Sequence, residues 1–460
     1  MPYDAGRFKD YFESQMTYGA GFRRNVARYG GAVAMIDPPT GRQWTYAQLG
    51  ADVDRCAAML AERGVRSGDR VMYQLFNGVE FALLYLAAHR LGAISVPINY
   101  RLAPGETAHI LRDSEPSVFI VDAECAASAA QALELSGTSP QVLVVGEADL
   151  QQGWENFDAA LQAAAGELPD LPADYSTYEE STRLYTSGTT GMPKGVSLPS
   201  LAELMSAHDV IMHFPLSPQD RTLNMTPWFH RGGLHSGGPN PSFYIGAGVV
   251  PLRSFNPSTV LDWVGEYGLT FLIGAPTTLE MIAAEQEKQP RDISTLKGIV
   301  TMGAPLDRAA ALRYQELLTP RIFNGYGTTE AFWNTFLRPE DLPARAGTAG
   351  RACTDDDVAV VKVFPDRRGR PDELAAQDST EAGEVIMRSP KAGYSYVNLP
   401  GVEEEKFFEG WLYPGDMATW DEDGFVTILG RKDDMIISGG ENLYPVQVEG
   451  VLAEHPEMLD

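Results

Sequence analysis

The sequence predicts an α/β fold: a large N-terminal domain of two α/β subdomains and a small β-barrel-like subdomain, followed by the start of a small C-terminal α/β domain. Three observations lead to this prediction. The chain has 460 residues, which is too long for one simple hydrophobic core. Up to about residue 345, short apolar runs alternate with helical patterns, as in parallel α/β proteins. Beyond that point, short β-rich pieces are separated by glycine, proline and aspartate, which favours a small antiparallel or barrel-like unit.

The first α/β subdomain begins with an amphipathic helix and then alternates strands with helices. Its predicted elements, in order, are a helix at 46–63 that ends at Gly64, a strand at 71–75, a helix at 81–91, and strands at 93–97 and 117–122. The stretch 142–178 is looser and acidic, so we interpret it as a connector.

The second α/β subdomain repeats this alternation, and the β-rich subdomain follows it. The predicted elements are helices at 257–267 and 277–286 and strands at 270–273, 298–302, 358–364, 383–388 and 424–429. The expected boundaries are 1–430 for the N-terminal domain (two α/β subdomains to about 345, the β-rich subdomain over 346–430), 431–434 for a hinge and 435–460 for the start of the C-terminal domain. A helix predicted at 445–453 cannot bury its apolar face alone, so the sequence predicts that the C-terminal domain is cut short.

Charge and composition exclude several classes of function. The net charge is 36 − 62 = −26, which repels phosphate backbones and argues against nucleic acid as a partner. Cys56, Cys125 and Cys353 lie far apart and form no C-x-x-C pattern, so we predict neither a disulfide framework nor a zinc site, and a cytoplasmic location. The N-terminus has no signal-peptide pattern, and the apolar runs are too short for a transmembrane segment.

A glycine- and threonine-rich run at 185–196, YTSGTTGMPKGV, predicts a loop that binds a polyphosphate. It follows an apparent strand. Its glycines allow close backbone approach, its hydroxyls donate hydrogen bonds, and Lys194 supplies a compact positive charge. The loop residues are Thr186, Ser187, Gly188, Thr189, Thr190 and Gly191. The run is not a Walker A motif, because Lys194 is followed by Gly195. A surface turn is the plainer alternative.

This run resembles the phosphate loop of the adenylate-forming superfamily, which comprises acyl-CoA and aryl-CoA ligases, luciferases and peptide-synthetase adenylation domains. Further motifs follow in the family's order, so the resemblance covers nearly the whole chain. It implies that ATP (or AMP), Mg²⁺ and coenzyme A are cofactors. It also implies that Lys194 offsets the triphosphate charge and that Glu330 and Thr186 hold Mg²⁺, a hard cation that takes oxygen ligands.

The resemblance assigns the nucleotide site to several later motifs. In the run NGYGTTE at 324–330, it implies that Tyr326 stacks on adenine and that Thr329 contacts the α-phosphate. Asp416 is similar to the family's carboxylate that accepts hydrogen bonds from both ribose hydroxyls. Arg431 is similar to a group that reaches the ribose or the α-phosphate. The other implied residues are Gly303, Ala304 and Pro305 beside the adenine, Asn324, Gly325, Gly327 and Thr328, the hinge residue Asp433, and Gly439 and Gly440 in the pantetheine tunnel.

The run PWFHRGGL at 227–234 is similar to the family's acid-binding motif. The resemblance implies that Trp228, Phe229 and His230 lie near the acyl carboxylate, with His230 among the catalytic residues. Gly233, Gly274 and Gly325 complete the expected substrate pocket. The aspartate that peptide-synthetase domains use to hold an ammonium group is not seen here, so we favour a non-amino carboxylic acid. Most of the other histidines are interpreted as structural, and the role of His235 stays open.

Three functions remain open at this stage. The first is a complete acid–CoA ligase, which passes the acyl group to free CoA or to the pantetheine of a carrier protein. The second is an enzyme of one half-reaction, either adenylation alone or thioester formation from a supplied adenylate. The third is a non-catalytic nucleotide-binding scaffold. The family also uses a lysine late in the C-terminal domain, and no residue matches it, so we expect weak adenylation from these 460 residues. A homodimer is also left open.

Overall fold

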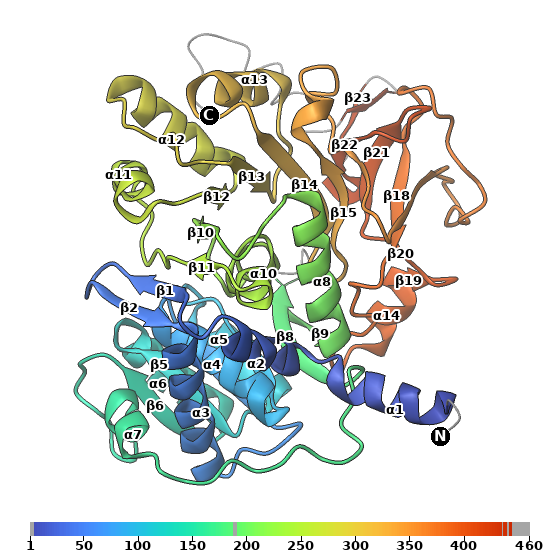
Figure 1. The fold of residues 1–460 in the computed structure, drawn as a ribbon. Coiled ribbons are helices and arrows are strands. Elements are labelled where there is room, and N and C mark those ends of the chain that lie inside the picture. Colours follow the sequence, from blue (N-terminus) through green and yellow to red (C-terminus); the bar gives the residue numbers. More distant parts are fainter. Residues whose placement is uncertain (1–3, 187–190, 435, 439–440, 444–460) are drawn as a thin grey trace. The chain divides into compact units, whose positions relative to one another are not determined.

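The computed structural model describes residues 4–186, 191–434, 436–438 and 441–443. The chain forms two compact units (Figure 1). Unit 1 comprises Met1–Phe255 and Gly393–Pro400, and unit 2 comprises Asn256–Ala392 and Gly401–Asp460.

A seven-stranded sheet, in the order β7-β6-β5-β3-β4-β8-β9, forms the centre of unit 1. Its strands are β3 (Arg70–Gln74), β4 (Ile94–Pro97), β5 (Val118–Asp122), β6 (Gln141–Val145), β7 (Glu155–Asn156), β8 (Glu180–Thr186) and β9 (Lys194–Pro199). All neighbours are parallel except β8 and β9, which form an antiparallel pair. The predicted parallel α/β arrangement is therefore confirmed for this unit.

Helices cover both faces of this sheet, as the near-continuous apolar strands require. On β5, Val118 and Ile120 join a core cluster with helices α3 (Tyr46–Glu62) and α4 (Val79–Leu91). The alternate residues Phe119 and Val121 join a second cluster with α5 (Pro104–Ser114) and α6 (Ala126–Ser136). Because successive side chains of a strand point to opposite faces, the sheet has a helical layer on each side.

The other elements of unit 1 follow the same chain. The remaining strands are β1 (Val33–Asp37), β2 (Arg42–Thr45), β10 (Arg221–Asn224) and β11 (Gly248–Val249), and the remaining helices are α1 (Ala5–Gln15), α2 (Tyr18–Arg28), η1 (Ala123–Cys125), α7 (Phe157–Ala163), α8 (Ser200–His213), α9 (Arg231–His235) and α10 (Pro239–Ile245). The four strands are hydrogen-bonded in the order β10-β11-β1-β2. At the start of α3, Thr45 and Gln48 form a capping box, which fixes the helix end that the sequence predicts.

The expected connector at 142–178 is wrong in part, because it contains three regular elements. Strand β6 pairs in parallel with β5, and β7 and α7 follow it. Val142, Leu143 and Val144 are buried in this strand. Four apolar residues are enough to form a buried strand in a parallel sheet, even though the residues that follow are polar and acidic.

Unit 2 combines a mostly parallel sheet with an antiparallel one. In the first, five strands are neighbours in the order β16-β15-β14-β13-β12. They are β12 (Phe271–Gly274), β13 (Gly298–Met302), β14 (Ile322–Thr328), β15 (Phe332–Leu337) and β16 (Arg351–Ala352). Strands β12, β13 and β14 are parallel, while β14 and β15 form a hairpin. The helices of unit 2 are α11 (Pro257–Tyr267), α12 (Pro276–Lys288), α13 (Arg308–Leu317), η2 (Pro339–Asp341), α14 (Pro400–Lys406, whose first residue belongs to unit 1) and η3 (Lys432–Asp434).

The β-rich part of the sequence forms the antiparallel sheet, as predicted. Its strands are β17 (Asp357–Val361), β18 (Gly383–Arg388), β19 (Phe407–Phe408), β20 (Trp411–Leu412), β21 (Asp416–Trp420) and β22 (Val426–Arg431). Strands β23 (Ile436–Ser438) and β24 (Glu441–Leu443) form a separate antiparallel pair. The helix predicted at 445–453 lies outside the described residues. Among the helices that the structure describes, none is both long and apolar enough to span a membrane.

Candidate active site

The predicted phosphate loop connects the two strands of the β8–β9 hairpin in unit 1. Thr186 ends β8 and lies opposite Lys194, the first residue of β9. Two contacts fix the ends of the loop: the Tyr185 hydroxyl donates to Asp113 Oδ2 over 2.6 Å, and His109 Nε2 lies 3.1 Å from the Pro193 carbonyl oxygen. Residues 187–190, which include the predicted Ser187, Gly188, Thr189 and Thr190, lie outside the described residues. Gly191 has φ = +128°, a conformation that favours glycine.

A cavity of about 400 Å³ in unit 2 brings the predicted nucleotide residues together. Its lining includes Gly303, Ala304, Pro305, Asn324, Gly325, Tyr326, Gly327, Asp416 and Arg431. These residues come from the ends of β13, β14, β21 and β22. The volume falls in the range of sites for small molecules and cofactors.

Asp416 is the centre of the polar contacts in this cavity. It begins β21 and lies opposite Arg431 of β22. Arg431 Nη1 donates to Asp416 Oδ1 over 2.9 Å, and the Tyr326 hydroxyl donates to Asp416 Oδ2 over 2.6 Å. Burial and the neighbouring Asp416 carboxylate raise the pKa of Tyr326 well above its usual range, so its hydroxyl keeps its proton. A carboxylate has about four acceptor positions, so Asp416 can still receive ligand hydroxyls.

Two glycines of β14 in the cavity wall lie too close to β15 to carry a side chain. A Cβ atom on Gly327 would lie 1.5 Å from the Phe332 carbonyl oxygen, and one on Gly325 would lie 2.7 Å from the Trp333 indole nitrogen. Gly303, just after β13, has φ = +85°. The close approach of β15 to β14 therefore depends on the absence of a side chain at Gly327.

The turn at the tip of this hairpin carries the predicted Thr328, Thr329 and Glu330. All three are partly buried, and none lines the cavity. Thr328 Oγ1 accepts the Ala331 backbone N–H over 3.2 Å. The Glu330 carboxylate of unit 2 is a hard oxygen donor of the kind that Mg²⁺ prefers, and so is the Thr186 hydroxyl of unit 1, so each residue by itself suits the implied metal.

The acid-binding motif lies in unit 1, and its residues differ in how deeply they are buried. Trp228 is 0% exposed and packs edge-on against Phe81 at 5.5 Å. It therefore belongs to the core, whereas the motif placed it in the pocket wall. Phe229 is buried against Tyr100, with ring centroids 5.4 Å apart. His230 is exposed at the N-cap of α9.

The protein around His230 keeps its imidazole neutral. Partial desolvation, with a smaller effect of the Arg101 charge, lowers the pKa of His230 to about 4. Water that reaches the exposed ring screens part of this effect, but the ring carries no charge at pH 7 in either case. Gly233 on α9 has no room for a side chain, since a Cβ atom would lie 1.9 Å from the Pro227 carbonyl oxygen. Gly274 is buried at the end of β12 in unit 2.

Part of the cavity lining was not predicted from the sequence. The missed residues are Leu306, Gly347, Thr348, Ala349, Ile428, Gly430 and Asp434. Gly430 and Asp434 flank the predicted Arg431 and Asp433, so the hinge motif was a usable signal for them. The run GTAG at 347–350 contains two glycines at positive φ, but a short glycine pair in a turn does not indicate a ligand. Asp433 lies in η3, and Gly439 and Gly440 lie outside the described residues.

Comparison with known proteins identifies the family. The model of the AMP-binding enzyme family matches residues 22–397. The chain is 31% identical to the indoleacetate–CoA ligase of Aromatoleum aromaticum, over 91% of this chain and 79% of that protein. It is 33% identical to the feruloyl-CoA synthase of an Amycolatopsis species, over 90% of this chain and 79% of that protein.

Solved structures agree with this result. The anthranilate CoA ligase AuaEII, in complex with anthranoyl-AMP, has a TM-score of 0.86 and 27% identity, covering 96% of this chain and 82% of that one. The O-succinylbenzoate CoA synthetase of Bacillus subtilis, in complex with ATP and magnesium ion, has a TM-score of 0.82 and 27% identity, covering 96% and 85%. With the nucleotide cavity in place, the chain therefore belongs to the AMP-binding enzyme family and is an acid–CoA ligase that uses ATP, Mg²⁺ and CoA.

Proposed function

We propose that this ligase activates a non-amino aromatic carboxylic acid and transfers its acyl group to free CoA. The observation that carries the nucleotide part is the cavity around Asp416, where the predicted adenine and ribose residues meet. The preference for an aromatic acid is supported by relatives that are named for indoleacetate, ferulate, 4-chlorobenzoate and anthranilate.

Each group of the cavity has a role in holding the nucleotide. Tyr326 and the loop at 303–305 offer a flat, small-residue surface for adenine. Asp416 accepts the ribose hydroxyls, since two of its acceptor positions remain beside the Tyr326 and Arg431 contacts. Arg431 adds a permanent positive charge toward the ribose or the α-phosphate.

The phosphate hairpin of unit 1 supplies the positive field for the triphosphate. Lys194 contributes its charge, and the loop that begins at Thr186 contributes hydroxyl and N–H donors. Glu330 and Thr186 are the residues proposed to hold Mg²⁺, which when bound would neutralise further phosphate charge. In an acidic chain of net charge −26, these local groups determine whether ATP binds.

The chemistry needs no nucleophilic side chain. In the first step a carboxylate oxygen of the acid attacks the α-phosphorus, a P–O bond forms, and the bond to pyrophosphate breaks. In the second step the CoA thiol loses its proton to solvent, its sulfur attacks the acyl carbon, and AMP leaves with the electron pair of the broken C–O bond. The protein contributes by positioning the reactants and by stabilising the developing charge.

His230 is proposed to border the acyl carboxylate as a neutral hydrogen-bond donor. A neutral ring does not hold the carboxylate as a tight ion pair, which would reduce its nucleophilicity toward phosphorus. Phe229 and Tyr100 present aromatic surface next to it.

A carrier protein is the second candidate acceptor. One relative, at 30% identity, is the fatty acid–[acyl-carrier-protein] ligase ScoC of Streptomyces coeruleorubidus, and pantetheine is common to both acceptors. We also propose a cytoplasmic location, in keeping with three buried free cysteines, and a division into an N-terminal domain at 1–430, a hinge at 431–434 and the start of a C-terminal domain.

The test is a product assay with a defined panel of acids. The protein is incubated with Mg-ATP and aromatic, short-chain and long-chain acids, with and without CoA, and products are read by mass spectrometry. We expect slow formation of acyl-AMP from aromatic acids without CoA, and of acyl-CoA with it. Ready-made acyl-adenylates with CoA measure the second step by itself. Product from long-chain acids only would reject the aromatic preference, and no product in any arm would reject the proposed function.

A further inference from the structure

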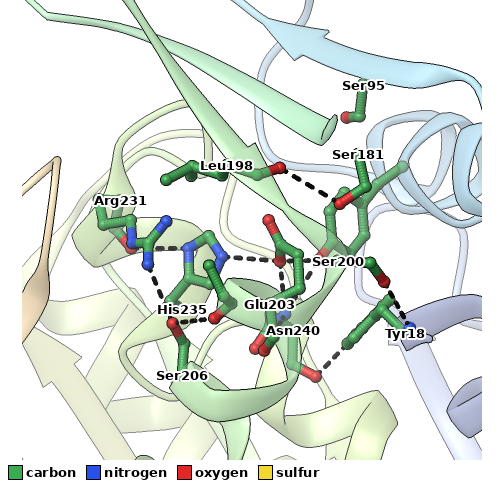
Figure 2. A network of polar contacts seen from close by, with 12 residues as sticks. Tyr18, Ser95, Ser181, Leu198, Ser200, Glu203, Ser206, Arg231, His235 and Asn240 are labelled. Atoms are coloured by element: carbon green, nitrogen blue, oxygen red, sulfur yellow. Dashed lines mark hydrogen bonds and ion pairs between the residues drawn. The ribbon is translucent and has the colours of Figure 1, made fainter. Parts of the chain in front are cut away.

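A buried carboxylate lies in the core of unit 1, close in sequence to the phosphate hairpin but outside the nucleotide cavity. Glu203 of α8 is 0% exposed. Its Oε2 atom receives three hydrogen bonds, one of them from the Tyr85 hydroxyl over 2.6 Å. The other two come from Asn240 Nδ2 over 2.7 Å and from His235 Nε2 over 2.8 Å (Figure 2). An unpaired buried charge is costly, so a carboxylate at this position requires these partners.

The three donors come from three different helices. Tyr85 belongs to α4, His235 to α9 and Asn240 to α10. One oxygen atom of α8 thus connects four helices, of which α4 is distant in sequence from the other three. The network extends to Tyr18 of α2, whose hydroxyl donates to the Asn240 carbonyl oxygen over 2.7 Å.

Helix α9 is attached to α8 at two successive turns. The first attachment is the contact between Glu203 and His235, and the second is the hydrogen bond from Arg231 Nη2 to Ser206 Oγ over 3.0 Å (Figure 2). Glu203 and Ser206 are three residues apart on α8, and Arg231 and His235 are four apart on α9, so each pair lies on one helix face. An isolated helix of five residues is unstable, so α9 depends on contacts with its neighbours. These two attachments act together with Asn224, whose side-chain Nδ2 donates to the Gly232 and Gly233 carbonyl oxygens of α9 over 3.0 and 3.1 Å.

Glu203 stays ionised although it is buried. Burial by itself raises the pKa of Glu203, but His235, His89 and Arg231 together outweigh it and hold the pKa below its usual range. Burial lowers the pKa of His235, and the Glu203 carboxylate opposes this change. Because an ionised carboxylate only accepts hydrogen bonds, the ring donates to Glu203 from Nε2. The contact of 3.3 Å between Nδ1 and the Arg231 carbonyl oxygen would become a hydrogen bond only with a second proton.

The position of α9 determines the position of His230. His230 is the N-cap of α9 and directly precedes Arg231, so any rotation or shift of α9 moves its imidazole. We infer that Glu203 is a positioning residue for acid activation: through His235 it fixes α9 and thereby places His230 against the acyl carboxylate. This inference rests on the proposed function, in which His230 borders the acid. A displacement of about 1 Å at such a group is enough to cost on the order of 100-fold in rate.

The variants that test this inference are Glu203→Leu, Glu203→Gln and a control. Glu203→Leu removes all three acceptor contacts, while Glu203→Gln keeps the shape and one acceptor oxygen and secures a folded protein. The control is Tyr46→Phe, which removes another fully buried hydrogen bond of unit 1, the one from the Tyr46 hydroxyl to the Ala247 carbonyl oxygen over 2.7 Å. Steady-state adenylation gives KM for the acid and for ATP, and thermal unfolding reports the stability of each variant.

We expect Glu203→Leu to raise KM for the acid or lower kcat by about tenfold or more, with KM for ATP unchanged within about twofold. Glu203→Gln should be intermediate. Tyr46→Phe should lose stability but keep both KM values. If Glu203→Leu loses stability and keeps the KM for the acid and kcat of the parent protein, Glu203 is only structural and the inference is overturned.

A second measurement keeps the inference separate from the proposed function. In protein labelled with ¹³C at the histidine Cε1 atoms, the His230 signal is assigned by its loss in His230→Gln. We expect this signal to shift in Glu203→Leu and not in Tyr46→Phe. Absence of acyl-AMP and acyl-CoA from the parent protein would reject the proposed function, whereas an unshifted His230 signal in Glu203→Leu would reject the positioning role.

Discussion

Among the residues of the nucleotide cavity, Asp416 is the one on which the polar contacts depend most. It is 8% exposed and accepts from both Tyr326 and Arg431. Replacing Asp416 would leave the Tyr326 and Arg431 donors without their acceptor. The loss of stability would then exceed what the hydrogen bonds themselves contribute. The cavity therefore depends on this carboxylate both for its own geometry and for the ribose.

We predict that Asp416→Asn weakens the binding of AMP by at least about tenfold, because the amide loses the charge and one acceptor oxygen. Isothermal titration calorimetry measures the change in Kd. The matched control is Asp357→Asn on the neighbouring β17, where an exposed ion pair with Arg388 contributes little. Equal Kd values for AMP in Asp416→Asn and the parent protein would show that Asp416 does not bind the ribose.

Another residue connects the stability of unit 1 to pH. His89 of α4 is 3% exposed, and neither of its ring nitrogens has a hydrogen-bond partner among the described residues. Burial lowers the pKa of His89 from 6.5 to about 4, with Glu203 opposing the change and His235 adding to it. Between these two values the unfolded chain binds a proton that the folded chain does not. Protonation of His89 in the unfolded chain therefore lowers the free energy of unfolding as the pH falls from about 6.5 toward about 4.

We predict that His89→Leu makes the free energy of unfolding less sensitive to pH. At pH 5.5 the proton uptake by the unfolded parent costs about 1.4 kcal/mol relative to pH 7.5, and the variant lacks this cost. Urea unfolding at both values measures it, and both lie above the sequence pI of about 4.6. His109→Gln controls for the removal of a histidine as such. A parent and a His89→Leu variant with the same dependence on pH would contradict the prediction.

At the scale of secondary-structure elements, the β14–β15 hairpin holds the site together. It carries the run at 324–330 along one strand and its turn, and its close approach depends on the absence of a side chain at Gly327. A clash with backbone atoms cannot be relieved by a change of rotamer. The strands would have to separate, and this would move Tyr326 and Glu330 together.

We predict that Gly327→Ala lowers the affinity for AMP by on the order of tenfold or more and destabilises unit 2, because the hairpin must open to admit the methyl group. Calorimetry and thermal unfolding measure the two effects. In the control, Gly401→Ala on α14, a Cβ atom meets nothing within 4 Å, so neither quantity should fall. Unchanged AMP binding in Gly327→Ala would mean that the hairpin adapts without moving the site.

The helices and strands that were predicted correctly are those whose signals are local in the sequence. The predicted segments at 257–267, 298–302 and 383–388 coincide with α11, β13 and β18, because their periodicity and their end signals are local. Strand β6 was missed because its four apolar residues stand within polar sequence and become a strand only by pairing with β5. Its stability is a property of the sheet, which local pattern does not contain.

The site shows the same limit. The cavity around Asp416 was largely predictable, since most of its residues belong to continuous motifs. The placement of Trp228 in the core and the missed lining at 347–349 were not, because they depend on how separate segments pack. Glu203 and Tyr85 are 118 residues apart, and no spacing rule connects them. Sequence alone left His235 open for this reason.

At the scale of the whole molecule, charge is the dominant collective property. A net charge of −26 spread over 460 residues creates self-repulsion in the compact state, even where individual side chains form ion pairs. Many of the described ion pairs have exposed partners, such as the pair between Arg388 and Asp357, and exposed pairs contribute little to stability. Salt should therefore lower the stability less by weakening these ion pairs than it raises the stability by screening the net charge.

We accordingly predict that the temperature of thermal unfolding rises by a few degrees when NaCl is increased from about 10 mM to about 150 mM at pH 7.5. The Debye length then falls from about 30 Å to about 8 Å, so repulsion between distant carboxylates is screened while close, buried pairs are affected little. Differential scanning calorimetry measures the shift, and potassium chloride should give the same result if the effect is ionic strength alone. A fall in the unfolding temperature would mean that the ion pairs outweigh the collective repulsion, and would assign them a larger share of the stability than their exposure indicates.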